Sequence, residues 1–177
     1  MQKLEQNYRN YSLKNSFLKR YLFEIRDFLI KRNKTLGISE SCTGGYLSYL
    51  FNLLPNSSKF FKGSVVVYTN EIKEKILGVD KEKLSNFGAV SKEVSIDMAK
   101  KVKNLLNVDY SIGVTGNLGP ISLEGKKRGL VYTTFLFDKN FILKEFLFSG
   151  QREEIRKKLV YNIIYNFYII LKRGMFW

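Results

Sequence analysis

Three short clusters of hydroxyl, amide and charged residues, each following a strand-like segment, are candidates for a catalytic site. They are Glu40–Gly45 (ESCTGG), Tyr68–Lys73 (YTNEIK) and Thr115–Pro120 (TGNLGP). A strand-to-helix junction such as the first cluster can expose a hydroxyl or a thiol and present free helix N–H groups to an oxygen or an anion. Alternatively, Ser41 or Thr43 is only the N-cap of the following helix. Because three clusters follow three predicted strands, we expect them to meet in one pocket.

The chain contains no histidine, which limits the general bases that a nucleophile can use. Ser-His-Asp and Cys-His catalysis are excluded, so the base must be Lys, Tyr, Asp or Glu. A serine hydroxyl attacks an amide only when a base takes its proton, and a lysine kept neutral by desolvation can do so. Lys73 is the candidate base. Tyr68 comes near it if Tyr68 ends a strand, and its phenol can then relay a proton to departing ammonia; otherwise both are ordinary surface or strand-end residues.

Cys42 competes with Ser41 for the role of nucleophile. A thiolate is intrinsically the better nucleophile, but free cysteines are commonly buried, and a side chain in a turn that enters a helix can point into the core. We therefore favour Ser41. The backbone N–H groups between Cys42 and Gly45 are candidates for stabilising an oxyanion, and the sequence does not choose among them.

The sequence does not indicate a metal or a cofactor. One cysteine cannot form an internal disulfide, and without histidine it cannot build a Cys/His zinc site. Gly125-Lys126 lacks the following Ser/Thr and the upstream glycine of a P-loop, and no strand is followed by the three-glycine dinucleotide fingerprint. We therefore expect chemistry carried out by side chains alone.

The order and spacing of the three clusters resemble the CinA C-terminal domain family, the nicotinamide-nucleotide amidohydrolases, also called nicotinamide mononucleotide deamidases. The resemblance covers roughly residues 35–172. It is carried by Glu40–Gly45, Tyr68–Lys73 with Ile76–Val79 behind it, Gly88–Ser91, and Val114–Gly116 followed by Gly119–Pro120. One loop departs from the family pattern: Asn117-Leu118 replaces Ile-Ala, and Ile121–Gly125 follows the proline where the family has more glycines.

The resemblance implies hydrolysis of the carboxamide of nicotinamide mononucleotide to nicotinic acid mononucleotide and ammonia. It implies a serine acyl-enzyme on Ser41, with Tyr68 and Lys73 as catalytic partners, and an assembly that is a dimer or larger. The residues that we expect to bind the substrate are Glu40, Cys42, Thr43, Gly44, Gly45, Asn70, Thr115, Gly116 and Arg152.

Two of these substrate-binding assignments have simpler alternatives. Thr115 and Gly116 are expected to line the nucleotide side of the pocket, or else they form only a strand-to-loop turn. Arg152 matches an arginine in the family's closing Gly-x-Arg pattern. It either meets the phosphate or forms only a salt bridge.

Two other functional classes compete with an amidase. The altered loop 117–128 and the basic ends of the chain suggest a catalytically inactive nucleotide-binding or interaction protein. The net charge of +14 and pI near 9.8 suggest nucleic-acid binding. However, the first 34 residues carry +6, residues 35–150 carry +4 and residues 151–177 carry +4. We interpret this excess as solvated faces of terminal helices, with anionic substrates or partners as the alternative, and we do not expect nucleic-acid binding.

Hydrophobic periodicity predicts the elements that place the clusters. Helices are expected at Ser16–Lys31, 46–54, 70–77, 81–86, 91–106 and from 150 onward, and strands at Lys34–Ser39, Gly63–Tyr68, Asp109–Val114, Gly129–Phe137 and Phe141–Phe148. Because Gly63–Tyr68 is almost continuously apolar, we expect it to be a central strand covered on both faces. The last two strands are expected to pair antiparallel through an Asp138–Asn140 turn.

These elements predict an α/β fold, a single three-layer α/β/α domain with a mixed, mainly parallel sheet and an antiparallel hairpin near the C-terminus. The domain is expected to span residues 16–177 and to follow a polar N-terminal extension, residues 1–15. Met1–Asn15 has no signal-peptide core, and Leu159–Leu171 is too short and too polar for a membrane span. We therefore expect a cytoplasmic protein without a membrane partner.

Overall fold

The structure is a computed structural model that describes residues 16–121, 124–137 and 140–173, and its centre is a five-stranded sheet in the order β2-β1-β3-β4-β5. The strands are β1 (Leu36–Glu40), β2 (Phe61–Val66), β3 (Tyr110–Gly116), β4 (Leu130–Phe137) and β5 (Asn140–Leu147). β1 pairs in parallel with β2 and β3, whereas β4 pairs antiparallel with β3 and β5. The antiparallel hairpin is therefore confirmed. Two residues of its predicted turn, Asp138 and Lys139, lie outside the described residues, as does the expected extension 1–15.

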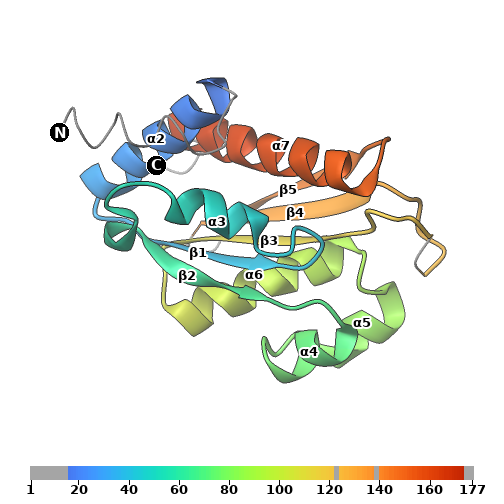
Figure 1. The fold of residues 1–177 in the computed structure, drawn as a ribbon. Coiled ribbons are helices and arrows are strands. Elements are labelled where there is room, and N and C mark those ends of the chain that lie inside the picture. The colour runs from blue at the N-terminus through green and yellow to red at the C-terminus, as the bar shows by residue number, and fades with distance from the viewer. Residues whose placement is uncertain (1–15, 122–123, 138–139, 174–177) are drawn as a thin grey trace.

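Helices cover both faces of this sheet. They are α2 (Ser16–Lys31), α3 (Tyr46–Asn52), the 3₁₀ helix η2 (Ser57–Lys59), α4 (Asn70–Lys75), α5 (Lys81–Phe87), α6 (Lys92–Leu106) and α7 (Arg152–Arg173). Figure 1 shows α2, α3 and α7 on one face and α6 on the other, with α4 and α5 beside it. The predicted three-layer α/β/α arrangement around a mixed sheet is confirmed.

Helices α2 and α7 pack on one another, and their buried side chains share one hydrophobic core with those of the sheet. The buried side chains of α2 recur at three- or four-residue spacing: Leu18, Leu22, Ile25 and Leu29. On α7 the ring of Phe167 stacks against Phe135 of β4, with ring centroids 6.0 Å apart. Among the described helices, even the 22 residues of α7 do not combine the length and the apolar character needed to cross a membrane.

The prediction that Gly63–Tyr68 forms a central strand is wrong. The strand is β2, which starts at Phe61, ends at Val66 and lies at the edge of the sheet. Its side chains are only partly covered, and Val66 is 47% exposed. The middle strand is β3, and between it and β2 lies β1, whose five residues are all buried although they include Gly37 and Ser39. The apolar run therefore predicted a strand correctly but did not predict the position of that strand in the sheet.

α6 lies very close to β3, and this packing positions the segment before α6. A Cβ atom on Gly113 would come within 2.5 Å of the Ser95 carbonyl oxygen, so only glycine allows the approach. The Ser95 hydroxyl donates to the Gly113 carbonyl at 3.0 Å. As predicted, Ser91 caps the helix, because its hydroxyl accepts the Val94 N–H at 3.3 Å. The Gly88–Ser91 turn is thereby held beside the end of β3.

Candidate active site

The three polar clusters meet at one edge of the sheet because β1, β2 and β3 are parallel. Ser41 directly follows β1, Tyr68 lies two residues after β2, and Thr115 and Gly116 end β3. The convergence that the sequence predicts is therefore present. It depends on strand direction, since the carboxyl ends of parallel strands lie on the same edge.

A pocket of about 200 Å³ opens where these segments meet. It is lined by Ser41, Cys42, Tyr68, Lys73, Ala89, Val90, Thr115, Gly116, Asn117, Leu118 and Arg152. Seven of the twelve residues expected in the site belong to this lining. The pocket therefore combines a hydroxyl, a thiol, an amine and a guanidinium with an apolar wall.

The amine of Lys73 lies against the hydroxyl of Ser41. Its Nζ is 3.1 Å from Ser41 Oγ and donates to the carbonyl oxygen of Tyr68 at 2.9 Å. The Lys73 side chain is only 1% exposed. Helix α4 holds Lys73 in this position. Thr69 caps the short helix by accepting the Ile72 N–H, and the Lys73 side chain, which follows Ile72, is buried. Serine and lysine are thus within hydrogen-bonding distance across two separate elements.

Burial lowers the pKa of Lys73 from its ordinary value of 10.5 to about 8, because an ammonium is poorly solvated there. Cys42, when its thiol is ionised, and Glu124 oppose this shift, and both effects are smaller than that of burial. Within the described residues, no carboxylate forms an ion pair with the amine. A substantial fraction of Lys73 is therefore neutral near pH 8, and neutral amine can accept the Ser41 proton.

Cys42 lines the same pocket but is poorly suited to attack. The side chain is 4% exposed, and burial raises the pKa of its thiol to about 12. The thiol is therefore protonated at neutral pH, whereas the nucleophilic form of cysteine is the thiolate. This environment favours Ser41 over Cys42.

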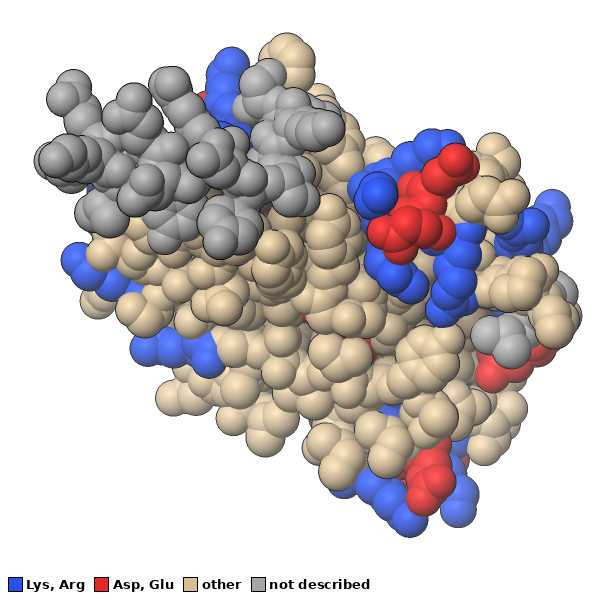
Figure 2. Space-filling model, viewed as in Figure 1, with Lys and Arg blue, Asp and Glu red and all other residues tan. Residues whose placement is uncertain are grey.

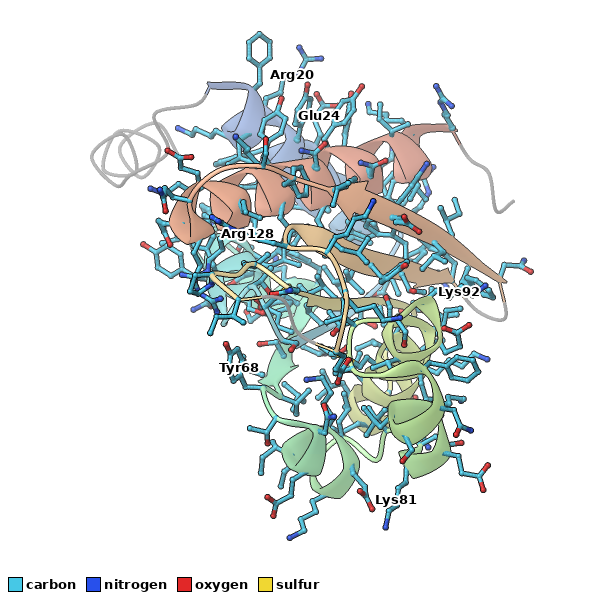
Figure 3. All side chains as sticks on the ribbon, turned by 90° about the vertical axis from the view of Figure 1, so that its right-hand side faces the viewer. Arg20, Glu24, Tyr68, Lys81, Lys92 and Arg128 are labelled. Atoms are coloured by element: carbon cyan, nitrogen blue, oxygen red, sulfur yellow. The ribbon has the colours of Figure 1, made fainter. Side chains whose placement is uncertain are left out.

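Tyr68 lies at the mouth of the pocket and contacts Lys73 through its backbone rather than its phenol. Its side chain is 62% exposed, and Figure 3 shows it standing clear of the ribbon on the same side of the molecule as Arg128. The Tyr68 hydroxyl accepts a hydrogen bond from Arg152 Nη2 at 3.0 Å. Because the oxygen accepts this bond, the phenolic proton stays available for transfer.

Arg152 joins three segments at the pocket edge. From the first turn of α7 it reaches Tyr68 and also donates through Nη1 to the carbonyl oxygen of Gly119. Among the described residues no acidic side chain pairs with Arg152, so the predicted salt-bridge alternative is not observed. Figure 2 shows basic and acidic side chains side by side over this end of α7. A cation without an acidic partner at a pocket edge suits an anionic ligand.

Glu40 does not line the pocket. Its carboxylate is fully buried and accepts the N–H groups of Gly45 at 3.0 Å, Leu47 at 3.3 Å and Ser48 at 2.9 Å, together with the Ser48 hydroxyl. These are the donors that the start of α3 leaves without intrahelical partners. Glu40 therefore fixes the start of α3 behind the nucleophile, where its negative charge also meets the positive end of the helix.

This carboxylate narrows the choice of oxyanion donors. The Gly45 N–H is taken by it, and the Gly44 N–H donates to the Ser41 carbonyl oxygen at 3.2 Å. In the described part of the chain, no backbone or side-chain oxygen accepts the N–H groups of Cys42 and Thr43. Of the four groups that the sequence suggested, these two are free to bind a developing oxyanion.

Four more expected substrate-binding residues lie outside the pocket lining. Thr43 is buried, and its hydroxyl has no partner among the described residues. Gly44 and Gly45 form the turn into α3, and Asn70 is an exposed residue in the first turn of α4. These residues shape or flank the segments that carry Ser41 and Lys73.

Residues 20–169 match the family model described as the CinA C-terminal domain. The chain belongs to this family. The CinA-like protein of Petrotoga mobilis is 40% identical over 148 residues, and that of Endomicrobium trichonymphae is 47% identical over 133 residues. These matches cover 83% and 75% of this chain but only 37% and 31% of the two relatives. The chain therefore spans about a third of their length.

Solved structures show the same fold. A CinA superfamily protein from Enterobacter cloacae superposes with a TM-score of 0.84 at 30% identity, over 87% of this chain and 92% of the other. The competence/damage inducible protein CihA from Agrobacterium tumefaciens gives 0.84 at 28% identity, over 91% and 99%. The open α/β arrangement is thus that of the CinA superfamily.

Sequence reasoning missed part of the wall of this CinA-family pocket. Ala89, Val90 and Leu118 supply its apolar surface. Asn117 lines it too and holds the loop, because its side-chain oxygen accepts the Gly119 N–H at 3.0 Å. The Gly88–Ser91 and Thr115–Pro120 motifs could have indicated these residues. Both motifs carried the family resemblance, but the sequence analysis did not assign them to the pocket wall. Across the described residues, no group of three or more His, Cys, Asp or Glu side chains is arranged to hold a metal ion.

Proposed function

We propose that this CinA-family chain is an amidohydrolase that converts nicotinamide mononucleotide to nicotinic acid mononucleotide and ammonia. The observation that carries the proposal is the buried Lys73 amine, which lies 3.1 Å from Ser41 Oγ and has a pKa lowered to about 8. A serine beside a lysine that is neutral near working pH is an activated nucleophile. The choice of nicotinamide mononucleotide as the substrate is based on the family resemblance.

In the proposed first step, Lys73 takes the hydroxyl proton while Ser41 Oγ attacks the carboxamide carbon. The N–H groups of Cys42 and Thr43 bind the oxyanion of the tetrahedral intermediate. Collapse of the intermediate breaks the C–N bond, and ammonia leaves with a proton from the Lys73 ammonium or from the phenol of Tyr68. An ester on Ser41 remains.

The second step hydrolyses this ester. A water molecule gives a proton to the group that protonated the ammonia, either the neutral Lys73 amine or the Tyr68 phenolate, and attacks the ester carbon in the same oxyanion site. The C–O bond to Ser41 breaks, the serine oxygen regains a proton, and the carboxylic acid product is released. No metal or redox partner is needed, because every proton passes between substrate, water and these side chains.

The pocket suits one end of a nucleotide. Its volume of about 200 Å³ is smaller than the roughly 300–1,000 Å³ of sites that enclose a whole drug-sized ligand. We therefore place the pyridine carboxamide inside, against Ala89, Val90 and Leu118, with the ribose and phosphate extending over the rim. Arg152 lies at that rim without an acidic partner and is the proposed phosphate contact.

The direct test is ammonia release from nicotinamide mononucleotide by the purified protein, with Ser41→Ala and Cys42→Ala measured in parallel. We expect turnover that Ser41→Ala abolishes and Cys42→Ala largely retains. Release that survives Ser41→Ala but is lost in Cys42→Ala reassigns the nucleophile to the thiol. No release by the unmodified protein refutes the amidase.

A catalytically inactive nucleotide-binding protein is the second candidate. The observation in its favour is the loop after β3, where Asn117 is buried and bonded to Gly119 and Lys126 at a position that the family fills with isoleucine. Calorimetric binding of nicotinamide mononucleotide without ammonia release would select this candidate. We further propose a dimer or larger assembly, as the family implies, to be checked by sedimentation velocity.

A further inference from the structure

Arg128 lies beside the pocket because the two ends of the loop after β3 pair with each other. The Asn117 N–H donates to the Leu130 carbonyl oxygen at 2.9 Å, and the Gly129 N–H donates to the Asn117 carbonyl oxygen at 2.7 Å. The Asn117 side chain also accepts the Gly119 N–H at 3.0 Å. The loop that departs from the family pattern therefore closes on itself and brings Arg128 back to Gly119.

The side chain of Arg128 packs directly on Gly119. Gly119 has a φ of +82°, in the left-handed region, and a Cβ atom on it would come within 2.7 Å of Arg128 Nε. Glycine therefore leaves the space that this guanidinium occupies. Arg128 Nη2 also donates to the carbonyl oxygen of Gly150, two residues before Arg152. Arg128 thus reaches from the loop to the start of α7.

Arg152 approaches the same glycine from α7. Its Nη1 donates to the Gly119 carbonyl oxygen, and its Nη2 donates to the Tyr68 hydroxyl. Two guanidinium groups therefore contact one loop residue, and Arg152 is the one that lines the pocket. Arg128 and Arg152, here called the arginine pair, are consequently neighbours at the rim of the pocket.

The arginine pair keeps hydrogen-bond donors for a ligand. A guanidinium carries several N–H donors in a fixed planar fork and cannot lose its charge at ordinary pH. The contacts above use two donors of Arg152 and one of Arg128, and every acceptor is an uncharged oxygen. Both charges and most of the donors are therefore available at the rim.

The acidic residues in the first turn of α7 do not neutralise the pair. Glu153 forms an ion pair with Arg156, and Glu154 accepts the Gln151 N–H at 3.1 Å. Within residues 16–121, 124–137 and 140–173, no carboxylate forms an ion pair with either member of the arginine pair. The rim therefore carries two positive charges that an anionic ligand can meet.

We propose that Arg128 joins Arg152 in binding the phosphate of the nucleotide and is a specificity-determining residue supplied by the loop after β3. A phosphate monoester carries a charge between about −1.5 and −2 at pH 7, and its oxygens accept the parallel N–H groups of a guanidinium. Two neighbouring cations match this charge better than one does. The proposal rests on the proposed function, which places the phosphate over the rim.

The test compares two ligands that differ only in the phosphate. Nicotinamide mononucleotide and nicotinamide riboside are titrated by calorimetry into Ser41→Ala protein, in which turnover is blocked, and into the same protein carrying Arg128→Gln or Arg128→Lys. Glutamine removes the charge but keeps a polar side chain, and lysine keeps the charge. The matched control is Lys127→Ala, which removes an exposed cation from the adjacent position of the same loop. Thermal unfolding followed by circular dichroism checks that each variant is folded.

We expect Arg128→Gln to raise the dissociation constant for nicotinamide mononucleotide about 3- to 10-fold and to leave that for the riboside nearly unchanged. The factor is smaller than the one expected for Arg152, because Arg128 is the more exposed of the two and water screens its charge. Arg128→Lys should lose less affinity than Arg128→Gln. Lys127→Ala should change the binding of either ligand by less than about twofold.

Equal weakening of both ligands in Arg128→Gln would limit Arg128 to supporting the loop and would overturn the proposal. Unchanged binding in Arg128→Gln, an equal effect of Lys127→Ala, or no binding of nicotinamide mononucleotide at all would overturn it too. Ammonia release by protein that retains Ser41 tests the proposed function separately. If phosphate-dependent binding requires Arg128 but no ammonia is released, the proposed function fails and the arginine pair stands as the phosphate site.

Discussion

Lys73 Nζ lies 3.1 Å from Ser41 Oγ although the two residues are 32 positions apart in the sequence. The contact exists because β1 and β2 are parallel neighbours, so the turn after one strand meets the helix after the other. The amine is buried and makes no ion pair within the described residues, which leaves desolvation as the dominant influence on its protonation. The predictions below test the consequences of this pair and of the residues that hold it.

Activity should rise with pH through a midpoint near 8. Lys73 must be neutral to accept the Ser41 proton, and its pKa is lowered to about 8 by burial. Below that pH the amine is an ammonium and the reaction slows roughly tenfold per pH unit; above it the rate levels off. The measurement is kcat/KM for ammonia release across pH 6 to 10, and the midpoint is obtained by fitting this pH profile. A flat profile over this range contradicts Lys73 as the base.

Lys73→Met should abolish activity and yet stabilise the fold. Removing a general base lowers kcat by about 10²–10⁴-fold. In the unfolded chain the lysine titrates near its ordinary 10.5, and in the folded protein near 8, so folding at neutral pH requires an unfavourable buried charge or the loss of a proton. We expect a gain on the order of 1 kcal/mol in the free energy of unfolding at pH 7.

The pH dependence of this gain has a definite sign. Between pH 8 and 10.5 the unfolded chain binds more protons at Lys73 than the folded protein does, so the stability of the unmodified protein increases with pH there. The advantage of Lys73→Met should therefore be largest below pH 8 and shrink above it. Urea unfolding at pH 7 and pH 9.5 measures both values. A methionine variant that is less stable at pH 7 would show that the hydrogen bonds of Lys73 outweigh its desolvation.

Much of this site follows from local sequence signals. The absence of histidine directed attention to lysine, and helix periodicity placed Ser41 in the turn before α3 and Lys73 within α4. Hydroxyl caps were also readable, since Ser91 caps α6 as expected. These features depend on spacing of a few residues, which the sequence shows directly.

The sequence did not predict features that depend on which strand or side chain lies next to another. The apolar run of β2 suggested a central strand, but strand order follows from the whole sheet and places β2 at the edge. Glu40 was expected to bind substrate, yet its side chain turns to the start of α3. The contact of Glu124 with Ala89 joins segments 35 residues apart, and no local pattern marks it.

Glu40→Ala should destabilise the protein by about 3 kcal/mol in the free energy of unfolding. The substitution leaves three N–H groups and the Ser48 hydroxyl near α3 without their buried acceptor, and each hydrogen bond to a charged group is worth roughly 1.5–3 kcal/mol before relaxation and water entry. Urea unfolding monitored by circular dichroism measures the loss. Glu71→Ala, which removes an exposed carboxylate paired with Lys75, is the control and should change stability by less than about 0.5 kcal/mol. Equal effects of the two substitutions would refute the anchoring role of Glu40.

Arg152→Ala should weaken the use of a phosphorylated substrate more than that of its dephosphorylated analogue. If Arg152 contacts the phosphate, losing a charge-assisted hydrogen bond of roughly 1.5–3 kcal/mol raises KM for nicotinamide mononucleotide about 10- to 100-fold. Nicotinamide riboside lacks the phosphate, so its kcat/KM should change far less. Lys157→Ala removes an exposed cation from the same helix and serves as the control for general charge effects. Because Arg152 also holds Tyr68 and Gly119, equal losses for both substrates would assign it to shaping the pocket instead of binding the phosphate.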